Sequence, residues 1–374
     1  MLCPARLALA LLVTMATALA ASGAASADVR DLGPVANDSA LSAYGGWVVW
    51  SERQPDGRWN LVGWHGGARV GPAVASRDAP FDADVGSDAH GRPVATYSRC
   101  IADPVAPAAY APVPGFVSPN GLPRQSLARG CGLRVLDLTS GRERALSVDR
   151  PVGAADTTPS MWRGDVAFAR MSGGATVAQV LIWRHRGGRL ARLSHGTVPT
   201  CPYGAGCTGA VRRGEVQQLD LGASGVAFVW DVAAPGVIGA GDGWELRVDD
   251  LRTGTSRGYD RGYQSGACGA RYPVSPTMVG SDVWFDELRW LCDVPHTSYV
   301  HGVADGHRGL LEAGPPLMWQ LAVDGRTAYS IRGPRPAAPS QDPPCIGSAG
   351  PCRLVAEPLP DLPATGRPVG GPFF

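Results

Sequence analysis

Six short apolar runs recur along this chain, and each is followed by a segment in which apolar and polar residues alternate. Turns rich in Gly, Asp or Ser separate the two kinds of segment. The repeat length falls in the range of propeller blades, where one repeat is one small antiparallel sheet. The six runs are Trp47–Trp50, Val94–Tyr97, Val166–Ala169, Val226–Trp230, Val283–Phe285 and Thr327–Tyr329.

The two kinds of segment predict different depths in the fold. A strand that is apolar at nearly every position must be covered on both faces, as happens when neighbouring blades stack on it. The alternating segments, such as Leu133–Leu138 and Leu246–Leu251, carry Arg or Asp at every second position and should lie further out. We therefore expect an all-β fold, a six-bladed β-propeller of four-stranded antiparallel blades. A β-sandwich is the structural alternative.

Two pairs of segments resemble a known repeat. Asp324–Ser330 and His90–Arg99 resemble the core of the WD40-like repeats in TolB-type propellers, and Leu133–Gly141 and Leu246–Gly254 resemble the strand and turn that follow it. The resemblance extends over most of residues 38–360. It implies a six-bladed propeller fold, without implying the envelope role of TolB itself.

The first 27 residues have the three parts of a secretory signal peptide. Arg6 precedes the apolar run Leu7–Ala20, and small residues follow at Ala25–Ala27. We expect cleavage before Asp28, a single propeller domain over 28–374, and a secreted protein with no membrane span. The absence of Lys among the basic residues is typical of a GC-rich bacterial genome.

Charge and composition exclude several function classes. Removing the signal peptide with its Arg6 leaves 33 basic residues against 33 acidic ones, a balance that argues against nucleic acid as a partner. A chain without Lys can form neither a Schiff base nor a P-loop. Motifs of serine hydrolases, zinc peptidases and sialidases are also missing, which favours a non-enzymatic protein while leaving an enzyme open.

The cysteines that remain after Cys3 is removed predict disulfides, because exported proteins fold in an oxidising compartment. Their spacing favours local pairs, each closing an excursion from the blades. The expected pairs are Cys100–Cys131, Cys201–Cys207, Cys268–Cys292 and Cys345–Cys352.

Three further features allow a functional interpretation beside a structural one. The acidic run Asp78, Asp82, Asp84 and Asp88 could supply oxygen ligands to Ca²⁺, although turn chemistry explains it better, and we expect no cofactor or metal. His296, His301 and His307 lack the spacing of metal ligands. Leu362–Gly366 matches a sortase motif but lacks the apolar span that should follow it.

Propellers bind ligands at the mouth of the central channel. The sequence places seven polar or aromatic residues there, and we expect Asp82 and Asp220 to face each other across the axis. We predict a monomeric, extracellular, non-enzymatic protein that binds a protein or glycan at this mouth or on the insertions at 101–130, 197–214 and 333–352. A hydrolase or lyase acting on a carbohydrate or lactone is the alternative. The channel residues are Asp82, Asp84, Gln217, Gln218, Asp220, Trp319 and Gln320.

Overall fold

The computed structural model describes most of the chain between Val29 and Pro368. The described residues are 29–36, 39–101, 129–173, 175, 177–193, 213–233, 242–264, 270–291, 294–304, 307–313, 318–333, 352–359 and 367–368. Every regular element in this part of the chain is a β-strand.

Four sheets have four antiparallel strands each. The first comprises β2 (Ser42–Tyr44), β3 (Trp47–Arg53), β4 (Trp59–His65) and β5 (Ala68–Val70). The second comprises β6 (Asp84–Ser87), β7 (Pro93–Arg99), β8 (Gly132–Asp137) and β9 (Glu143–Ala145). The third comprises β10 (Ala155–Trp162), β11 (Asp165–Met171), β12 (Gln179–Arg184) and β13 (Arg189–Arg192). The fourth comprises β22 (Met318–Asp324), β23 (Thr327–Arg332), β24 (Cys352–Pro358) and β1 (Arg30–Val35).

The fifth sheet has nine strands. Its members are β14 (Arg213–Leu221), β15 (Gly225–Ala233), β16 (Asp242–Asp250), β17 (Ser256–Gln264), β18 (Ala270–Val279), β19 (Asp282–Leu291), β20 (Val294–Ala304), β21 (His307–Ala313) and β25 (Arg367–Pro368). The prediction of separate four-stranded blades fails here, because the long strands β17 and β18 pair at their ends. Only Tyr263 with Arg271 and Gln264 with Ala270 form that pairing.

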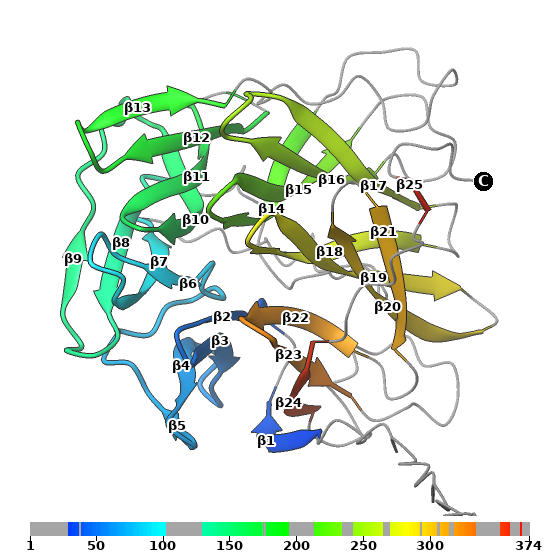
Figure 1. The fold of residues 1–374 in the computed structure, drawn as a ribbon. Helices are drawn as coiled ribbons and strands as arrows, with labels where there is room; N and C mark the ends of the chain where they lie inside the picture. Colours follow the sequence, from blue (N-terminus) through cyan, green and yellow to red (C-terminus); the bar gives the residue numbers. More distant parts are fainter. Residues whose placement is uncertain are drawn as a thin grey trace, which may run out of the picture.

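The sheets stand in a propeller-like ring, which confirms a propeller fold of antiparallel sheets, but the described residues form five sheets where six blades were expected (Figure 1). Strands β2, β6, β10, β14, β18 and β22 line its centre, each in contact with the next, and β22 in contact with β2. The ring is closed by the beginning of the chain, since β1 pairs with β24 beside the last hairpin.

Burial falls from the centre of the ring outwards, as the two kinds of sequence segment predicted. In the third sheet, β10 and β11 are almost wholly buried, β12 is buried at its middle, and all four residues of β13 are exposed. Neighbouring sheets then bury apolar side chains between them. One such cluster joins Ala167 and Ile182 to Val226, Phe228 and Trp230.

Close packing at the centre fixes some residue types. An added Cβ on Gly86 of β6 would lie 1.7 Å from the backbone oxygen of Met161 in β10. No larger residue fits there without moving one strand, so this glycine sets how closely the second and third sheets approach.

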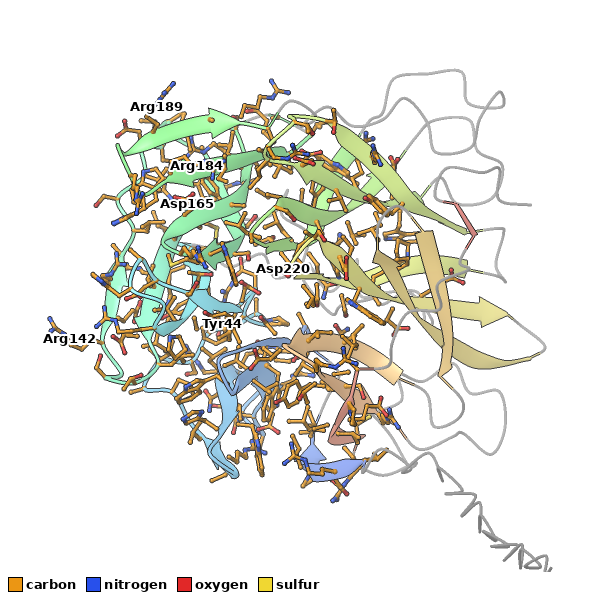
Figure 2. The ribbon with its side chains drawn as sticks, in the orientation of Figure 1. Tyr44, Arg142, Asp165, Arg184, Arg189 and Asp220 are labelled. Atoms are coloured by element: carbon orange, nitrogen blue, oxygen red, sulfur yellow. A yellow bond between two sulfur atoms is a disulfide. The ribbon has the colours of Figure 1, made fainter. Side chains whose placement is uncertain are left out.

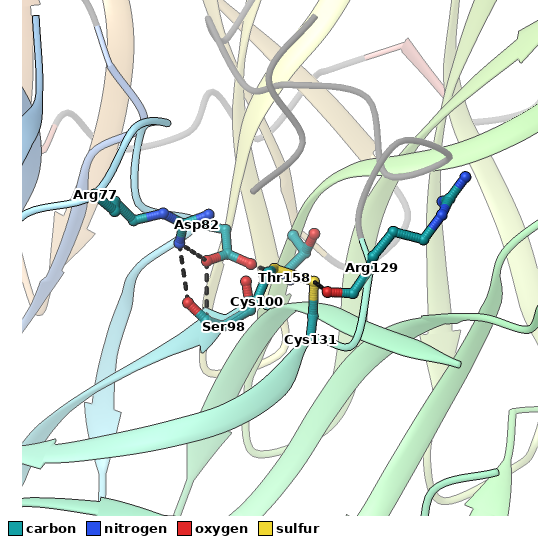
Figure 3. The surroundings of a disulfide bond; sticks show 7 residues. All are labelled: Arg77, Asp82, Ser98, Cys100, Arg129, Cys131 and Thr158. Atoms are coloured by element: carbon teal, nitrogen blue, oxygen red, sulfur yellow. Dashed lines mark hydrogen bonds and ion pairs between the residues drawn. A yellow bond between two sulfur atoms is a disulfide. The ribbon is translucent and has the colours of Figure 1, made fainter. Parts of the chain in front are cut away.

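The disulfide expected between Cys100 and Cys131 is present (Figure 3). Cys352 is also disulfide-bonded, but Cys345 lies outside the described residues. Cys201, Cys207, Cys268 and Cys292 lie outside them too, so the other three pairs stay predictions.

Several other predictions fall on residues that the structure does not describe. These include the signal peptide and Leu362–Gly366, while the side chains of His296, His301 and His307 are likewise undescribed. Among the described residues, no helix is long and apolar enough to cross a membrane.

Candidate functional site

A cavity of about 350 Å³ lies at the centre of the ring. It is lined by residues of all the central strands, including Ser42 and Tyr44 of β2, Asp84 of β6, Trp162 of β10 and Asp220 of β14. Figure 2 shows Tyr44 and Asp220 near the centre, whereas Arg142, Arg184 and Arg189 lie at the periphery. Among the described residues, the cavity wall includes four aspartates, at positions 82, 84, 220 and 324, and no basic residue.

Asp84 is the least satisfied of these carboxylates. The side chain is 9% exposed, and its Oδ1 accepts a hydrogen bond of 2.6 Å from the Ser42 hydroxyl. Its Oδ2 is buried and has no partner at hydrogen-bond distance among the described residues, while the Ser160 hydroxyl and the Met161 N–H lie near enough to the carboxyl to lower its pKa. Because a buried carboxylate oxygen is costly without a donor, this atom is a point at which a ligand donor would gain free energy.

Asp220 lies within electrostatic reach of Asp84. Its Oδ1 accepts a hydrogen bond of 3.2 Å from the Ser160 hydroxyl, and its Oδ2 accepts the Met278 backbone N–H. Burial raises the pKa of Asp220 to about 6, against these hydrogen bonds, which lower it. Burial and then the neighbouring Asp220 raise the pKa of Asp84 well above its ordinary value, opposed by Ser42, Ser160 and the Met161 backbone. The pair therefore retains its protons to higher pH than exposed aspartates do.

Asp82 lines the same cavity but serves the architecture of the ring (Figure 3). Its Oδ1 accepts the Ser98 N–H at 2.9 Å, and its Oδ2 accepts the Thr158 N–H at 2.7 Å. The buried Arg77 guanidinium lies 3.6 Å from Oδ1. The expectation that Asp82 faces Asp220 therefore needs correction: Asp84, two residues along, is the residue that interacts with Asp220, because Asp82 is turned to the N–H groups of β7 and β10.

Gln218 makes the equivalent connection between the central strands β14 and β18. Its side-chain oxygen accepts the Ser275 backbone N–H, and its amide donates to the side-chain oxygen of Gln320 at 3.3 Å. The Ser275 hydroxyl donates to the same Gln320 oxygen at 2.8 Å. Gln218 and Ser275 line the cavity, whereas Gln320 is fully buried behind them.

The two remaining predicted residues contribute less to the cavity. Gln217 is buried at the bulge of β14, where the pairing with β15 skips a residue, and it is not part of the cavity wall. Trp319 lies at the corresponding bulge of β22, and its side chain is outside the described set.

Thr158 and Ser275 are site residues that the sequence reasoning missed. Both have a positive φ, 51° and 52°, which is rare for residues other than glycine, and both precede a proline at a bulge of a central strand. In each case a side-chain oxygen at or beside the preceding central strand accepts the N–H of the unusual residue. The repeated Thr158-Pro159-Ser160 and Ser275-Pro276-Thr277 triplets were the signal that could have located them.

Aromatic residues form part of the cavity wall, also unforeseen. Tyr44 and Trp162 pack edge to face with ring centroids 5.7 Å apart. The exposed Arg163 guanidinium lies over Trp162, 5.8 Å from the ring centroid. Asp324 accepts the Gly46 N–H at 2.7 Å and so ties the last central hairpin to the first.

The aspartates of the acidic run that could supply ligands to Ca²⁺ each have a different structural partner. Asp78 lies 3.8 Å from Arg58, and Asp88 accepts the N–H groups of His90 and Arg92 within its own turn. Within the part of the chain that the structure describes, no three His, Cys, Asp or Glu side chains converge as a metal site would require.

Comparison with known proteins gives likeness of fold alone. No family model matches the chain, and no curated protein matches it. Among solved structures it is similar to TolB from Acinetobacter baumannii, with 10% identity, a TM-score of 0.42, and coverage of 84% of this chain and 64% of TolB. It is also similar to a fungal six-bladed lectin from Aleuria aurantia, with 9% identity, a TM-score of 0.43, and coverage of 80% and 89%. A third, a PL25 ulvan lyase, has 10% identity, a TM-score of 0.46, and coverage of 83% and 80%. The chain thus spans less than two thirds of TolB, and these similarities accompany a propeller-like ring without assigning its activity.

Proposed function

We propose that this chain is a secreted, non-enzymatic binding protein that holds a group of its protein or glycan ligand in the central cavity. The observation that carries the proposal is Asp84 Oδ2, a buried acceptor without a partner on the wall of a cavity of about 350 Å³. A rigid ring that leaves such an atom unsatisfied gains stability when a ligand donor reaches it.

Secretion and the six-repeat ring belong to the same proposal. The Cys100–Cys131 disulfide is typical of a protein that folds outside the cytoplasm. Strands β14–β17 and β18–β21 each repeat the four-strand pattern of the other sheets, so we infer that the nine-stranded sheet is two blades joined at one edge.

The test is binding to glycan and peptide arrays by the wild type and by Asp84→Asn. We expect wild-type binding to a restricted set of probes and a loss of at least about tenfold in the variant. Asp78→Asn is the matched control, because Asp78 is an exposed carboxylate outside the cavity wall. Arrays on which the wild type binds nothing, or on which Asp84→Asn binds equally well, would refute the proposal.

The carboxyl pair also favours the second candidate, a hydrolase or lyase acting on a carbohydrate or lactone. A protonated carboxyl beside an ionised one can serve as general acid and general base. The test is incubation of the protein with polysaccharides and with lactones. Hydrolysis of a polysaccharide is measured by the new reducing ends, lyase activity by the ultraviolet absorbance of unsaturated products, and lactone hydrolysis by the release of acid. Turnover that disappears in both Asp84→Asn and Asp220→Asn supports this candidate, and turnover retained by both excludes this pair as its site.

A further inference from the structure

The charges around the cavity are distributed unevenly. The chain carries 34 basic and 33 acidic residues, yet the part of the cavity wall that the structure describes has four aspartates and no basic side chain. Three of the four accept hydrogen bonds that hold the ring together: Asp82 from two backbone N–H groups beside Arg77, Asp324 from the Gly46 N–H, and Asp220 from Ser160 and the Met278 N–H. The acceptor left for a ligand is therefore Asp84 Oδ2, and Asp220 adds a neighbouring negative charge.

We propose that the group held by this pair is a single organic cation, a guanidinium or primary ammonium such as an Arg or Lys side chain carries. This inference rests on the proposed function, since it names the ligand class of the same cavity. Asp84 Oδ2 provides the acceptor without a partner, Asp220 the neighbouring charge, and Tyr44 an aromatic wall.

A planar cation fits these features better than a metal ion does. A metal needs several ligands converging at short distance, and the described residues offer no such group. A guanidinium needs carboxylate oxygens and tolerates an aromatic neighbour, which Tyr44 on the cavity wall provides, whereas the Trp162 ring already lies under Arg163. The cavity is also large enough for a side-chain head group rather than a bare ion.

The pH dependence of binding distinguishes a cationic ligand from a neutral sugar. An entering cation favours the ionised form of both carboxyls and displaces protons bound to them, so its affinity should rise with pH. A sugar hydroxyl that accepts a hydrogen bond from protonated Asp84 should instead bind more weakly as pH rises. The other titratable groups facing the pair are Asp82, Asp324 and Tyr44, while Arg77 is held by Asp82 and Arg163 lies on the outer side of Trp162.

The experiment is calorimetric titration of the full mature chain with matched small probes. Acetyl-arginine amide is compared with acetyl-citrulline amide, its neutral counterpart, and with a panel of methyl glycosides, at pH values from about 5 to 8. We expect the arginine probe to bind, the citrulline probe to bind at least about tenfold more weakly, and affinity for arginine to rise by up to tenfold per pH unit.

Variants identify the site. Asp84→Asn should weaken arginine binding by about tenfold or more and flatten its pH dependence, while Asp88→Asn, a turn aspartate outside the cavity wall, should leave both unchanged. Circular dichroism and thermal unfolding of each variant show that it is folded.

The failures of the two proposals are distinguishable. Binding of methyl glycosides with affinity that falls as pH rises, lost in Asp84→Asn, would overturn the cation and retain the central site. Equal binding of the arginine and citrulline probes would also overturn it. Arginine binding that survives Asp84→Asn and Asp220→Asn would overturn the central site itself.

Discussion

Two layers of the central ring use the same kinds of residue in opposite ways. We call Asp82–Thr158 together with Gln218–Ser275 the clasp layer, and Asp84–Asp220 the cavity layer. In the clasp layer both carboxylate oxygens of Asp82 and the side-chain oxygen of Gln218 accept backbone N–H groups, and the Gln218 amide donates to Gln320. In the cavity layer one oxygen of Asp84 has no partner at hydrogen-bond distance among the described residues, and the two carboxyls raise each other's cost of ionisation.

The difference shows which carboxylate stabilises the ring and which one is left for a ligand. Asp82 and Asp84 are separated by a single residue, Ala83, yet one supports the backbone of the neighbouring sheet and the other faces the cavity. Residue type alone does not distinguish a structural carboxylate from a binding one, whereas the set of donors around each does.

The sharpest way to break this comparison is to replace each aspartate by asparagine. In Asp82→Asn the new NH₂ group must face either the Ser98 or the Thr158 N–H, and buried Arg77 loses its counter-charge. We expect a loss of about 3–5 kcal/mol in the free energy of unfolding, measured by urea denaturation at neutral pH.

The cavity layer should respond differently. Asp84→Asn can keep the bond from Ser42 and removes the charge that opposes Asp220, so we expect a change within about 1 kcal/mol. Similar losses in the two variants would contradict the division into layers.

A smaller effect is expected where the central strands β6 and β10 touch. Gly86→Ala places a methyl group against the Met161 carbonyl and should cost about 1–3 kcal/mol. Gly71→Ala is the control, because that glycine has open space around its Cβ position and an ordinary φ. Equal denaturation midpoints for the two variants would mean that β6 and β10 can separate freely.

The sequence allowed the architecture to be predicted further than the site. Apolar periodicity located the strands that are buried on both faces, such as Trp47–Trp50 and Val166–Ala169, because burial depends on residue type and spacing. The merging of β17 with β18 could not be predicted, since it depends on two residue pairs at strand ends rather than on a pattern.

Sequence reasoning could place polar residues at the centre of the ring but could not pair them. Asp82, Asp84, Gln218 and Asp220 all line the cavity. Which of them faces the axis is decided by bulges and by the positive φ of Thr158 and Ser275, which turn neighbouring N–H groups toward Asp82 and Gln218. The aromatic wall of Tyr44 and Trp162 depends on contact between strands that are distant in sequence.

The last prediction concerns pH and isolates the cavity layer. The pKa values of Asp84 and Asp220 lie above the ordinary 3.8 in the folded protein, with Asp220 at about 6, so the folded state binds protons more tightly than the unfolded chain does. Their contribution to stability is therefore fully present below about pH 4 and is lost as pH rises through 6 and above.

Carboxylates with lowered pKa, such as Asp88 and Asp137, act in the opposite direction and at lower pH, so the wild-type curve alone mixes both effects. The difference between the wild type and the Asp84→Asn, Asp220→Asn double variant removes this background. We expect the wild type to lose at least about 2 kcal/mol relative to the double variant between pH 4 and 7, measured by denaturation at each pH. A difference that stays constant with pH would show that the two carboxyls ionise as freely as exposed ones, and the contrast between the layers would then be one of geometry without electrostatics.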